Sequence, residues 1–510
     1  MVYLTPGVYT EEFETGAKPI EGVSPSITAI IGETERGDTQ PQLLTSWDDY
    51  RNKFGGFFGR QEYVPYAVQG FFQNGGQLCY VSRIVPRDGG GEPDSASEAL
   101  GDWKVTAVGP GEWGNRVFVI AREGRVRGVQ IDVYHWREDP GEPLFDPEVR
   151  ANEDKPQPHI RETFEDLDAD ESSINFYEKR INGNSRFIEI EPDPPAGAPP
   201  AAIAPGDVAA LGGGVDTGAN LVVADFDGEG EPGARQGLAA LDEPDFRDVA
   251  IVYAPNSDEV AGLQARLANY CEDSKYRFAI LDSPARKSDI GTLTPRADVD
   301  SKYAAYYYPW IKVTSAETGA LNLVPPGGHI AGIYARSDTQ RGVFKAPANE
   351  TINGAVELEF RLTDADQGRL NPIGVNVLRA FPGRGRRVWG ARTLSSDPAW
   401  KYVNVRRFFN FVEASIDRST QWVVFEPNNE QLWARVVQTI KQFLRTQWRA
   451  GALMGRKEEQ AFYVRADRST MTQNEIDNGR LIVEIGLAAT KPAEFVIFRF
   501  TQFTAGSQAA

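Results

Sequence analysis

Alternation between apolar and polar positions marks the first elements of the chain. In the opening stretch, one side carries Tyr9, Glu11 and Phe13, and the other carries Val8, Thr10 and Glu12. This period of two predicts a strand. The apolar run at 27–32 predicts a buried strand, and short helices are predicted at 45–56 and 64–76, each ending at a double glycine. A strand at 77–85 completes a β–α–α–β arrangement.

The middle of the chain changes to strand-like patterns between two linkers. Gly, Pro and Ser are frequent in 86–102, and Pro and Ala dominate 192–207. Between them, 116–121, 128–136 and 186–191 have the apolar character of strands. A β-rich segment with linkers at both ends is predicted to be a domain inserted into the first one.

Alternation of strands and helices resumes after the second linker. Strands are predicted at 249–255 and 278–284, with a helix at about 260–271 between them. This order is typical of α/β layers built on a sheet.

Two amphipathic helices are predicted near the C-terminus. Within 404–420, one face collects Val405, Phe408, Phe409, Val412 and Ile416. Within 429–451, one face collects Leu432, Val436, Ile440, Phe443 and Leu444. The other side of the second helix carries Lys441, Arg445 and Arg449, spaced four residues apart as one basic row.

The chain ends on a very apolar predicted strand, which consists of Phe495, Val496, Ile497, Phe498, Arg499 and Phe500. An exposed strand of this kind invites pairing with another chain, because its backbone donors and acceptors are unpaired. Either it joins a sheet of its own chain or a partner receives it.

The predicted fold class is α+β, with a mixed-sheet α/β core domain built from N- and C-terminal parts of the chain. A β-rich domain is inserted into it, and extended linker strands lie at both termini. The predicted boundaries are 1–24 for the N-terminal arm, 25–88 and 241–490 for the two parts of the core, 89–240 for the insertion with its linkers, and 491–510 for the C-terminal strand.

Composition places the chain among globular proteins of several domains. It has 510 residues, of which 41% are hydrophobic, and we expect two to four domains. No run of about 18 apolar residues predicts a membrane span, and the N-terminus has no apolar segment typical of a secretory signal. The two cysteines, Cys79 and Cys271, are expected to be buried thiols in a reducing cytoplasm.

Charge is distributed unevenly around a net value of −18. Residues 379–457 contain 15 basic and 5 acidic side chains, a local charge of +10, so the remainder carries −28. Residues 138–172 contain 13 acidic and 3 basic side chains. We expect the basic region to face a negatively charged partner and the acidic stretch to stay solvated, although both are also compatible with chance clustering on solvated faces.

Candidate catalytic chemistry is sparse. The three histidines, His135, His159 and His329, belong to no zinc motif, and the chain has neither a nucleophile elbow nor a phosphate-binding loop. The stretch 383–390 is rich in Gly and Arg and is interpreted as a turn. An acidic loop beginning at Asp225 fails as a calcium loop, because Gln236 stands where a bidentate Glu is needed. We therefore predict no enzyme and no catalytic, cofactor or metal site.

Several stretches of the chain resemble the contractile tail sheath proteins of phages, R-type bacteriocins and phage-derived injection machines. They are TPGVYTEEFETGAKPIEGVSPSITAIIGETERG, FFQNGGQLCYVSRI, GEWGNRVFV, PPGGHIAGIYARSDTQRGVFKAPAN, LNPIGVNVLRAFPGRGRRVWGARTLSSDPAWKYVNVRRFFNFVEASI and NGRLIVEIGLAATKPAEFVIFRF. The resemblance covers roughly 3–120 and 245–503. Residues 121–240 match nothing in it, as expected for a variable outer domain.

The resemblance implies a structural subunit that polymerises helically, in six strands, around an inner tube protein. Contraction from a metastable extended state would drive the tube through a target envelope, and baseplate and terminal cap proteins would be further partners. No nucleic acid and no membrane insertion are expected. Assembly would take place in the bacterial cytoplasm, and the product would be a virion tail or a phage-like particle that stays in the cytoplasm, is anchored to a membrane or is released.

The resemblance also assigns roles to residues. The arm strand Val8–Phe13 and the last strand Phe495–Phe500 would link subunits through a sheet shared with a third subunit. The row Lys441, Arg445 and Arg449 would contact the inner tube. Two other interpretations are a nucleic-acid-binding scaffold that uses the basic region and an α/β hydrolase with an inserted lid, which would need a nucleophile–His–Asp cluster.

Overall fold

The computed structural model describes residues 19–59, 62–87, 93–141, 143–195, 199–216, 220–228, 230–255, 257–315 and 318–499. These residues form two compact units. We call Ser24–Gln340 with Pro347–Val403 the sheet unit. The described parts of Met1–Val23, Arg341–Ala346 and Asn404–Ala510 form the helical unit.

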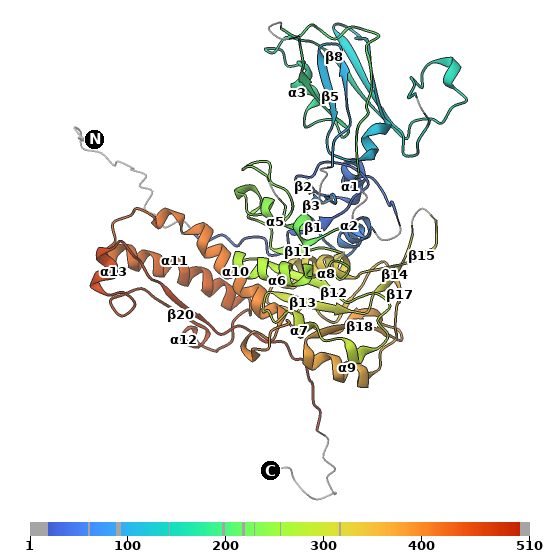
Figure 1. Cartoon of the computed structure of the whole chain (residues 1–510). Coiled ribbons are helices and arrows are strands. Elements are labelled where there is room, and N and C mark those ends of the chain that lie inside the picture. Colours follow the sequence, from blue (N-terminus) through green and yellow to red (C-terminus); the bar gives the residue numbers. More distant parts are fainter. Residues whose placement is uncertain are drawn as a thin grey trace, which may run out of the picture. The chain divides into compact units, whose positions relative to one another are not determined.

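A nine-stranded mixed sheet forms the centre of the sheet unit (Figure 1). In spatial order its strands are β16 (Glu350–Thr351), β19 (Gly385–Val388), β18 (Val375–Phe381), β13 (Ala304–Tyr308), β12 (Phe278–Asp282), β11 (Ile251–Tyr253), β1 (Thr28–Gly32), β3 (Cys79–Arg83) and β2 (Gln42–Leu44). The six strands from β18 to β3 are parallel, and the strands at both edges are antiparallel to their neighbours. Parallel neighbours need crossover connections, which helices supply here.

Helices cover both faces of this sheet. One face packs against α1 (Trp47–Phe54), α2 (Val64–Gln73) and α8 (Gly327–Arg341), and the other against α4 (Val223–Asp227), α5 (Gly237–Ala240) and α6 (Leu263–Ser274). Two short helices, α7 (Pro295–Asp298) and α9 (Asp364–Leu370), complete the connections. Strand residues alternate between the two cores, so that Ile30 lies in the first and Ile31 in the second. The sheet unit also contains a separate three-stranded sheet, in the order β15 (Leu321–Val324), β14 (Ile311–Thr314) and β17 (Ala355–Leu358).

The predicted β–α–α–β arrangement is confirmed, and so are the later strands and helix of the α/β layers. Strand β2 was not predicted, because it has only three residues. Close approach explains two glycines of α8. A Cβ at Gly328 would lie 2.4 Å from Ala67 Cα, and one at Gly332 would lie 2.3 Å from the Phe71 carbonyl oxygen, so α8 contacts the backbone of α2 directly.

Two further sheets build the inserted segment, which we define as residues 93–216. One sheet has the order β10 (Val208–Ala210), β6 (Val117–Glu123), β7 (Val129–His135) and β8 (Ile160–Leu167). The other has the order β4 (Ser97–Leu100), β5 (Trp103–Ala107) and β9 (Ile188–Pro192), with α3 (Tyr177–Ile181) nearby. The two sheets share one apolar core that includes Trp103, Val119 and Ile131.

The inserted segment begins and ends at the same place. Asp94 and Val215 pair as an antiparallel bridge, with the Val215 amide donating to the Asp94 carbonyl oxygen at 3.1 Å. The predicted end of the insertion at residue 240 is therefore too late. Phe226 and Leu238 pack into a core of the nine-stranded sheet, a tertiary contact that the linker composition could not reveal.

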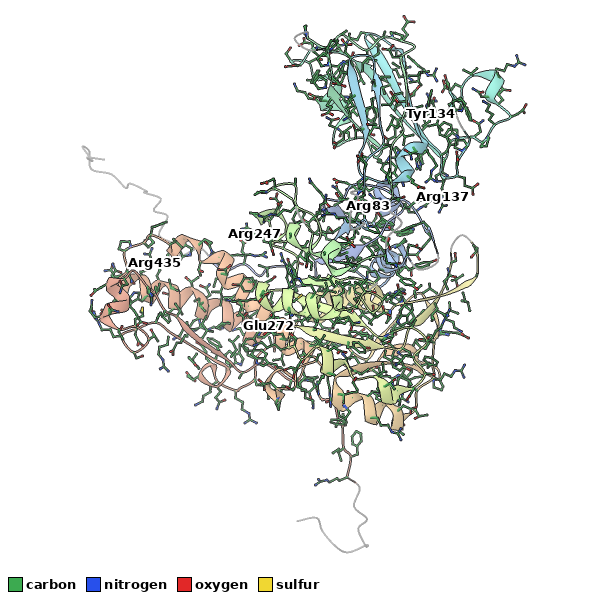
Figure 2. All side chains as sticks on the ribbon, in the orientation of Figure 1. Arg83, Tyr134, Arg137, Arg247, Glu272 and Arg435 are labelled. Carbon is green, nitrogen blue, oxygen red and sulfur yellow. The ribbon has the colours of Figure 1, made fainter. Side chains whose placement is uncertain are left out.

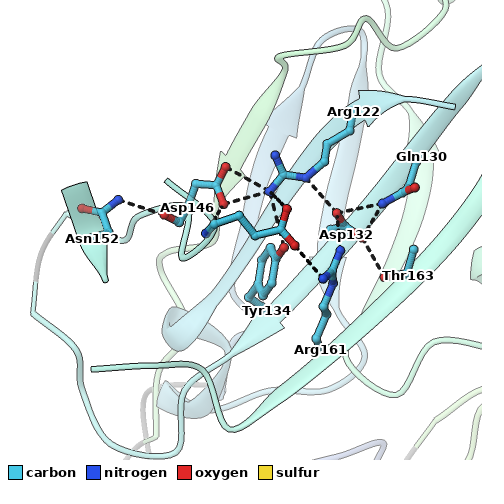
Figure 3. A network of polar contacts seen from close by, with 9 residues as sticks. Arg122, Gln130, Asp132, Tyr134, Asp146, Asn152, Arg161 and Thr163 are labelled. Carbon is cyan, nitrogen blue, oxygen red and sulfur yellow. Dashed lines mark hydrogen bonds and ion pairs between the residues drawn. The ribbon is translucent and has the colours of Figure 1, made fainter. Parts of the chain in front are cut away.

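The acidic stretch 138–172 is more than a solvated surface. Arg122, on β6, lies 2.9 Å from Asp132 and 2.8 Å from Asp146, and Arg161 bridges Asp132 and Glu148 at 3.1 and 2.6 Å (Figure 3). Asp132 is fully buried and also accepts a bond from the Thr163 hydroxyl at 2.7 Å. The expectation of a simply solvated stretch is wrong here, because some of its carboxylates meet arginines from neighbouring strands.

The helical unit contains α10 (Val403–Ser419), α11 (Glu430–Arg449), α12 (Glu458–Ala461) and α13 (Gln473–Asp477), with a two-stranded sheet of β20 (Phe462–Arg465) and β21 (Glu484–Leu487). Both amphipathic helices are confirmed. The predicted apolar face of α11 is buried throughout, whereas Phe409 and Ile416 of α10 are only half-buried. These helices and β20 build a core of their own, so 241–490 is not the single body expected from the sequence. Among the helices described, none is long and apolar enough to cross a membrane.

Candidate assembly surfaces

The C-terminal segment leaves the fold after a firm last anchor. Thr490 donates its amide to the Ala452 carbonyl at 3.0 Å and its hydroxyl to the Gly451 carbonyl at 3.0 Å. Beyond it, Phe495, Val496, Ile497 and Phe498 are 68–76% exposed, and residues 491–499 belong to no strand (Figure 1). A large apolar side chain is normally buried, so four in a row at this exposure mark a surface that lacks its partner.

Only part of the two predicted linker strands can be located. Phe495–Arg499 are described, whereas Phe500 and the whole arm strand Val8–Phe13 lie outside the described residues. Their pairing therefore stays a prediction.

The two-stranded sheet of the helical unit is small and has two edges. Phe462 pairs with Leu487, and Arg465 with Glu484. In the part of the chain that the structure describes, no third strand is assigned to either edge. Phe462 and Val464 point into the core beside α11, which holds the sheet in place. A sheet of two short strands has little stability alone and offers edges to a further strand.

Residues 19–23 anchor the N-terminal arm to α10. The Glu21 amide donates to Ser419 Oγ at 3.3 Å, and the Val23 amide donates to Ser415 Oγ at 3.1 Å. Ile20 is buried in the same core as α11. The anchor at residues 19–23 and the anchor at Thr490 therefore both belong to the helical unit. The sequence pattern did not indicate this anchor, because serines on a helix carry no signal of what they bind.

The basic row on α11 has an acidic neighbour. Arg445 donates to both carboxylate oxygens of Glu458, from Nε at 2.7 Å and from Nη2 at 3.1 Å. The hydrogen bond from Arg445, together with the charges of Lys441 and Arg449, lowers the pKa of Glu458. Lys441 is half-buried and Arg449 is exposed. The row remains on the surface with a net positive charge, partly compensated by a residue 13 positions away in sequence.

Comparison with known families decides what these surfaces belong to. Residues 228–394 match the family described as phage tail sheath protein central domain, and residues 395–503 match the phage tail sheath C-terminal domain. The two matches together cover more than half of the chain. The chain belongs to the contractile tail sheath family.

Individual sheath proteins agree with this assignment. A prophage major tail sheath protein of Pseudomonas aeruginosa is 26% identical over 274 residues, which cover 52% of this chain and 69% of that one. The contracted sheath complex of the extracellular contractile injection system PVC superposes with a TM-score of 0.59 at 26% identity, covering 98% of both chains. The baseplate structure of the anti-feeding prophage gives a TM-score of 0.57 at 25% identity, covering 99% of this chain and all of that one.

His329, the stretch 383–390 and the acidic loop at Asp227 were weighed as candidate chemistry, and each makes contacts that support the fold. His329 is buried in α8 against Gly70, and burial lowers its pKa to about 4. Within the stretch 383–390, only residues 383–384 lie in the turn between β18 and β19, and Gly385–Val388 form β19, so the predicted turn is confirmed only in part. Asp227, from the acidic loop, pairs with Arg266 at 2.5 Å. Within the described ranges, no three His, Cys, Asp or Glu side chains are arranged to hold a metal ion.

Sequence reasoning missed a group of carboxyls, one fully and two partly buried, at the carboxyl edge of the parallel sheet. Asp282 ends β12, is fully buried and accepts a bond from the Tyr253 hydroxyl at 2.6 Å. Burial raises its pKa to about 8. Burial and neighbouring carboxylates raise the pKa of Glu33 and of Asp258 to about 7. Each of these carboxyls ends or follows a predicted strand, and this position was the one sign in the sequence that they could lie at the same edge of the sheet.

Proposed function

We propose that this sheath subunit polymerises by β-strand addition into a cylinder around an inner tube. The segment Phe495–Phe500 of one copy would pair with the edge of the β20–β21 sheet of another, and the arm strand Val8–Phe13 would add to the same shared sheet. Contraction would then be a switch between two lattices of linked subunits, with no nucleotide needed to drive it.

The exposed C-terminal segment is the observation that carries the proposal. Phe495 to Phe498 expose 68–76% of their side-chain surface directly after the anchor at Thr490. The same unit presents a two-stranded sheet whose edges can receive a strand. If about five backbone hydrogen bonds form at roughly 1 kcal/mol each, one such link is strong yet free to pivot at its ends.

Charge supports a separate contact with the tube. Lys441, Arg445 and Arg449 lie on the side of α11 opposite its buried face. A surface of this kind favours an acidic partner and gives an interaction that weakens with salt. Baseplate and cap proteins would close the two ends of the cylinder. Nucleic acid and lipid have no part in the proposal.

Removal of residues 494–510 tests strand addition. We expect the truncated monomer to unfold at the same urea concentration as the intact chain, because the exposed segment adds nothing to a core. The truncated protein should form no cylinders by electron microscopy at concentrations where the intact protein does. Ile497→Pro should act in the same way, because it removes one ladder donor, and Ile497→Val should assemble normally. Ordinary cylinders from the truncated chain would refute strand addition.

A further inference from the structure

A fully exposed phenylalanine stands at the tip of a tight turn in the helical unit. Phe425 is 104% exposed, and Val424 beside it is 59% exposed. The Glu426 amide donates to the Val423 carbonyl at 3.2 Å, which closes a β-turn. Val424 has φ −67° and ψ 131°, and Phe425 has φ +66°. These angles define a type II turn with phenylalanine at the third position, where glycine is normally required.

This conformation is strained for a residue as bulky as phenylalanine. A strained, solvent-exposed aromatic residue contributes nothing to the fold of its own chain, so an observed outlier of this kind points to a function. Val424 and Phe425 form the feature that we call the knob.

The turn beneath the knob is held firmly. Arg435, which is labelled in Figure 2, lies over the Trp422 ring at 5.2 Å and 3.5 Å from the Glu426 carboxylate. On the other side, the Asn428 amide donates to the Arg480 carbonyl at 3.0 Å, and its oxygen accepts from Trp433 Nε1 at 2.7 Å. A braced loop presents its tip at little entropic cost, as a binding anchor should.

A pocket of matching size lies elsewhere on the same unit. It measures about 220 Å³ and is lined by Pro19, Ile20, Gly22, Thr439, Gln442, Phe443, Thr446 and Gln447. Two of its apolar lining residues, Ile20 and Phe443, are 9% and 6% exposed. A cavity of roughly 150 Å³ is large enough for benzene, so this pocket has room for one phenyl ring.

The knob cannot fill the pocket of its own chain in this fold. Phe425 lies five residues before α11, whereas the pocket opens near Phe443, in its second half. The two are separated along the helix by roughly 20 Å at 1.5 Å per residue. A knob and a hole at different places on one subunit make a head-to-tail contact, which generates a ring when its rotation closes and an open helical filament when it does not.

We propose that Phe425 of one copy inserts into the pocket between residues 19–22 and α11 of a neighbouring copy. This inference rests on the proposed function, because one wall of the pocket is the root of the N-terminal arm. Only residues 14–18 separate Pro19 from the arm strand Val8–Phe13, so a copy that receives this strand lies within roughly 20 Å of the pocket. A second sheath subunit is therefore favoured over the tube as the occupant.

Photo-crosslinking in assembled cylinders tests the contact. With p-benzoylphenylalanine in place of Phe425, irradiation should link one sheath copy to the next, and the linked peptide should map to 19–22 or 439–447. A head-to-tail contact gives a ladder of dimers, trimers and higher species on a denaturing gel. The same probe in place of Val126, which is 83% exposed in the inserted segment, is the matched control and should give no ladder.

A disulfide crosslink tests the same contact without replacing Phe425. Val424→Cys with Thr446→Cys should form the same ladder on oxidation, and either cysteine alone should not. The native Cys79 and Cys271 are buried and should form no crosslink. Cylinders that form normally and crosslink only to the tube, or to sheath residues outside the pocket, overturn the inference and leave strand addition standing. Failure of the unmodified protein to form any cylinder counts instead against the proposed function.

A third variant separates binding from folding. Phe425→Gly removes the ring and relieves the turn, so the monomer should unfold at the same or a higher urea concentration. We expect the concentration needed for half-assembly to rise at least about tenfold, as for the loss of a buried aromatic anchor. Unchanged assembly of this variant would overturn the inference.

Discussion

The nine-stranded sheet and the two-stranded sheet of this protein differ in how much of their pairing is completed within one chain. The large sheet is covered by helices on both faces and ends in edge strands of three and two residues, too short to recruit a further strand easily. The small sheet has two strands of four residues and edges without a third strand in the described residues.

The difference separates folding from assembly. Apolar residues of the large sheet are buried within the subunit, so they stabilise the monomer. The apolar residues at 495–498 are exposed within the subunit, so any stabilisation that they give appears only when a second chain covers them. Sequence composition alone does not distinguish the two sets.

The same substitution, Phe→Ala, at a buried and at an exposed site should separate monomer stability from assembly most clearly. Phe71→Ala removes a fully buried ring between α2 and the sheet, and should lower the free energy of unfolding by about 3–5 kcal/mol. Phe498→Ala removes a ring that is 76% exposed and should leave monomer unfolding unchanged, while it weakens cylinder formation. Urea unfolding of dilute protein and pelleting at high concentration measure the two effects. Equal destabilisation by both substitutions would contradict the division.

Charge reversal in the basic row should affect a partner and not the fold. Lys441→Glu, Arg445→Glu and Arg449→Glu together should reduce loading onto the tube protein by at least about tenfold at physiological salt, with cylinders of sheath alone still possible. Co-pelleting with the tube protein measures this. Arg445→Gln alone controls for loss of the pair with Glu458. Arg125→Glu, Arg127→Glu and Arg150→Glu together, at three exposed sites, control for the same change of total charge. Unchanged loading would remove the row from the tube contact.

The buried Asp282 should make the sheet unit less stable as pH rises. Its folded pKa of about 8 lies above the usual 3.8, so between these values the folded state holds a proton that the unfolded chain has released. The free energy of unfolding should therefore fall as pH rises through this window, by at most about 1.4 kcal/mol per pH unit for one carboxyl. Asp282→Asn should flatten the pH profile of urea unfolding, although Glu33 and Asp258 still contribute. Asp48→Asn, at an exposed site, should not change it.

Removal of the inserted segment should have the smallest effect on the rest. Asp94 and Val215 lie side by side, so a linker of about four glycine and serine residues can replace 95–214. Polar contacts join this segment to the remainder, such as Arg137, labelled in Figure 2, with Glu35 at 3.1 Å, and Arg186 with the Asn52 side chain at 3.1 Å. An exposed ion pair contributes about 1 kcal/mol or less. Urea unfolding should stay cooperative with nearly the same midpoint. A broad, non-cooperative transition would show that the segment is part of the core.

The sequence by itself determined the elements whose pattern repeats over many residues. Short apolar runs predicted the strands β1, β3, β11 and β12, and the period of 3.6 predicted the apolar faces of α10 and α11, because burial of one helix face imposes that period on the sequence. The apolar character of 495–500 and the basic row on α11, whose roles stay predictions, were also visible. So was the resemblance to the sheath family, which the comparisons confirm.

Only the tertiary structure decided which distant residues meet. Phe226 and Leu238 belong to the core of the large sheet and not to the insertion, Glu458 lies beside Arg445, and residues 19–22 form a pocket with α11. These contacts join positions that have no common period along the chain, so no local pattern records them. Their formation depends on how whole elements pack, and that packing is the physical reason why the assembly surfaces emerge only in the folded subunit.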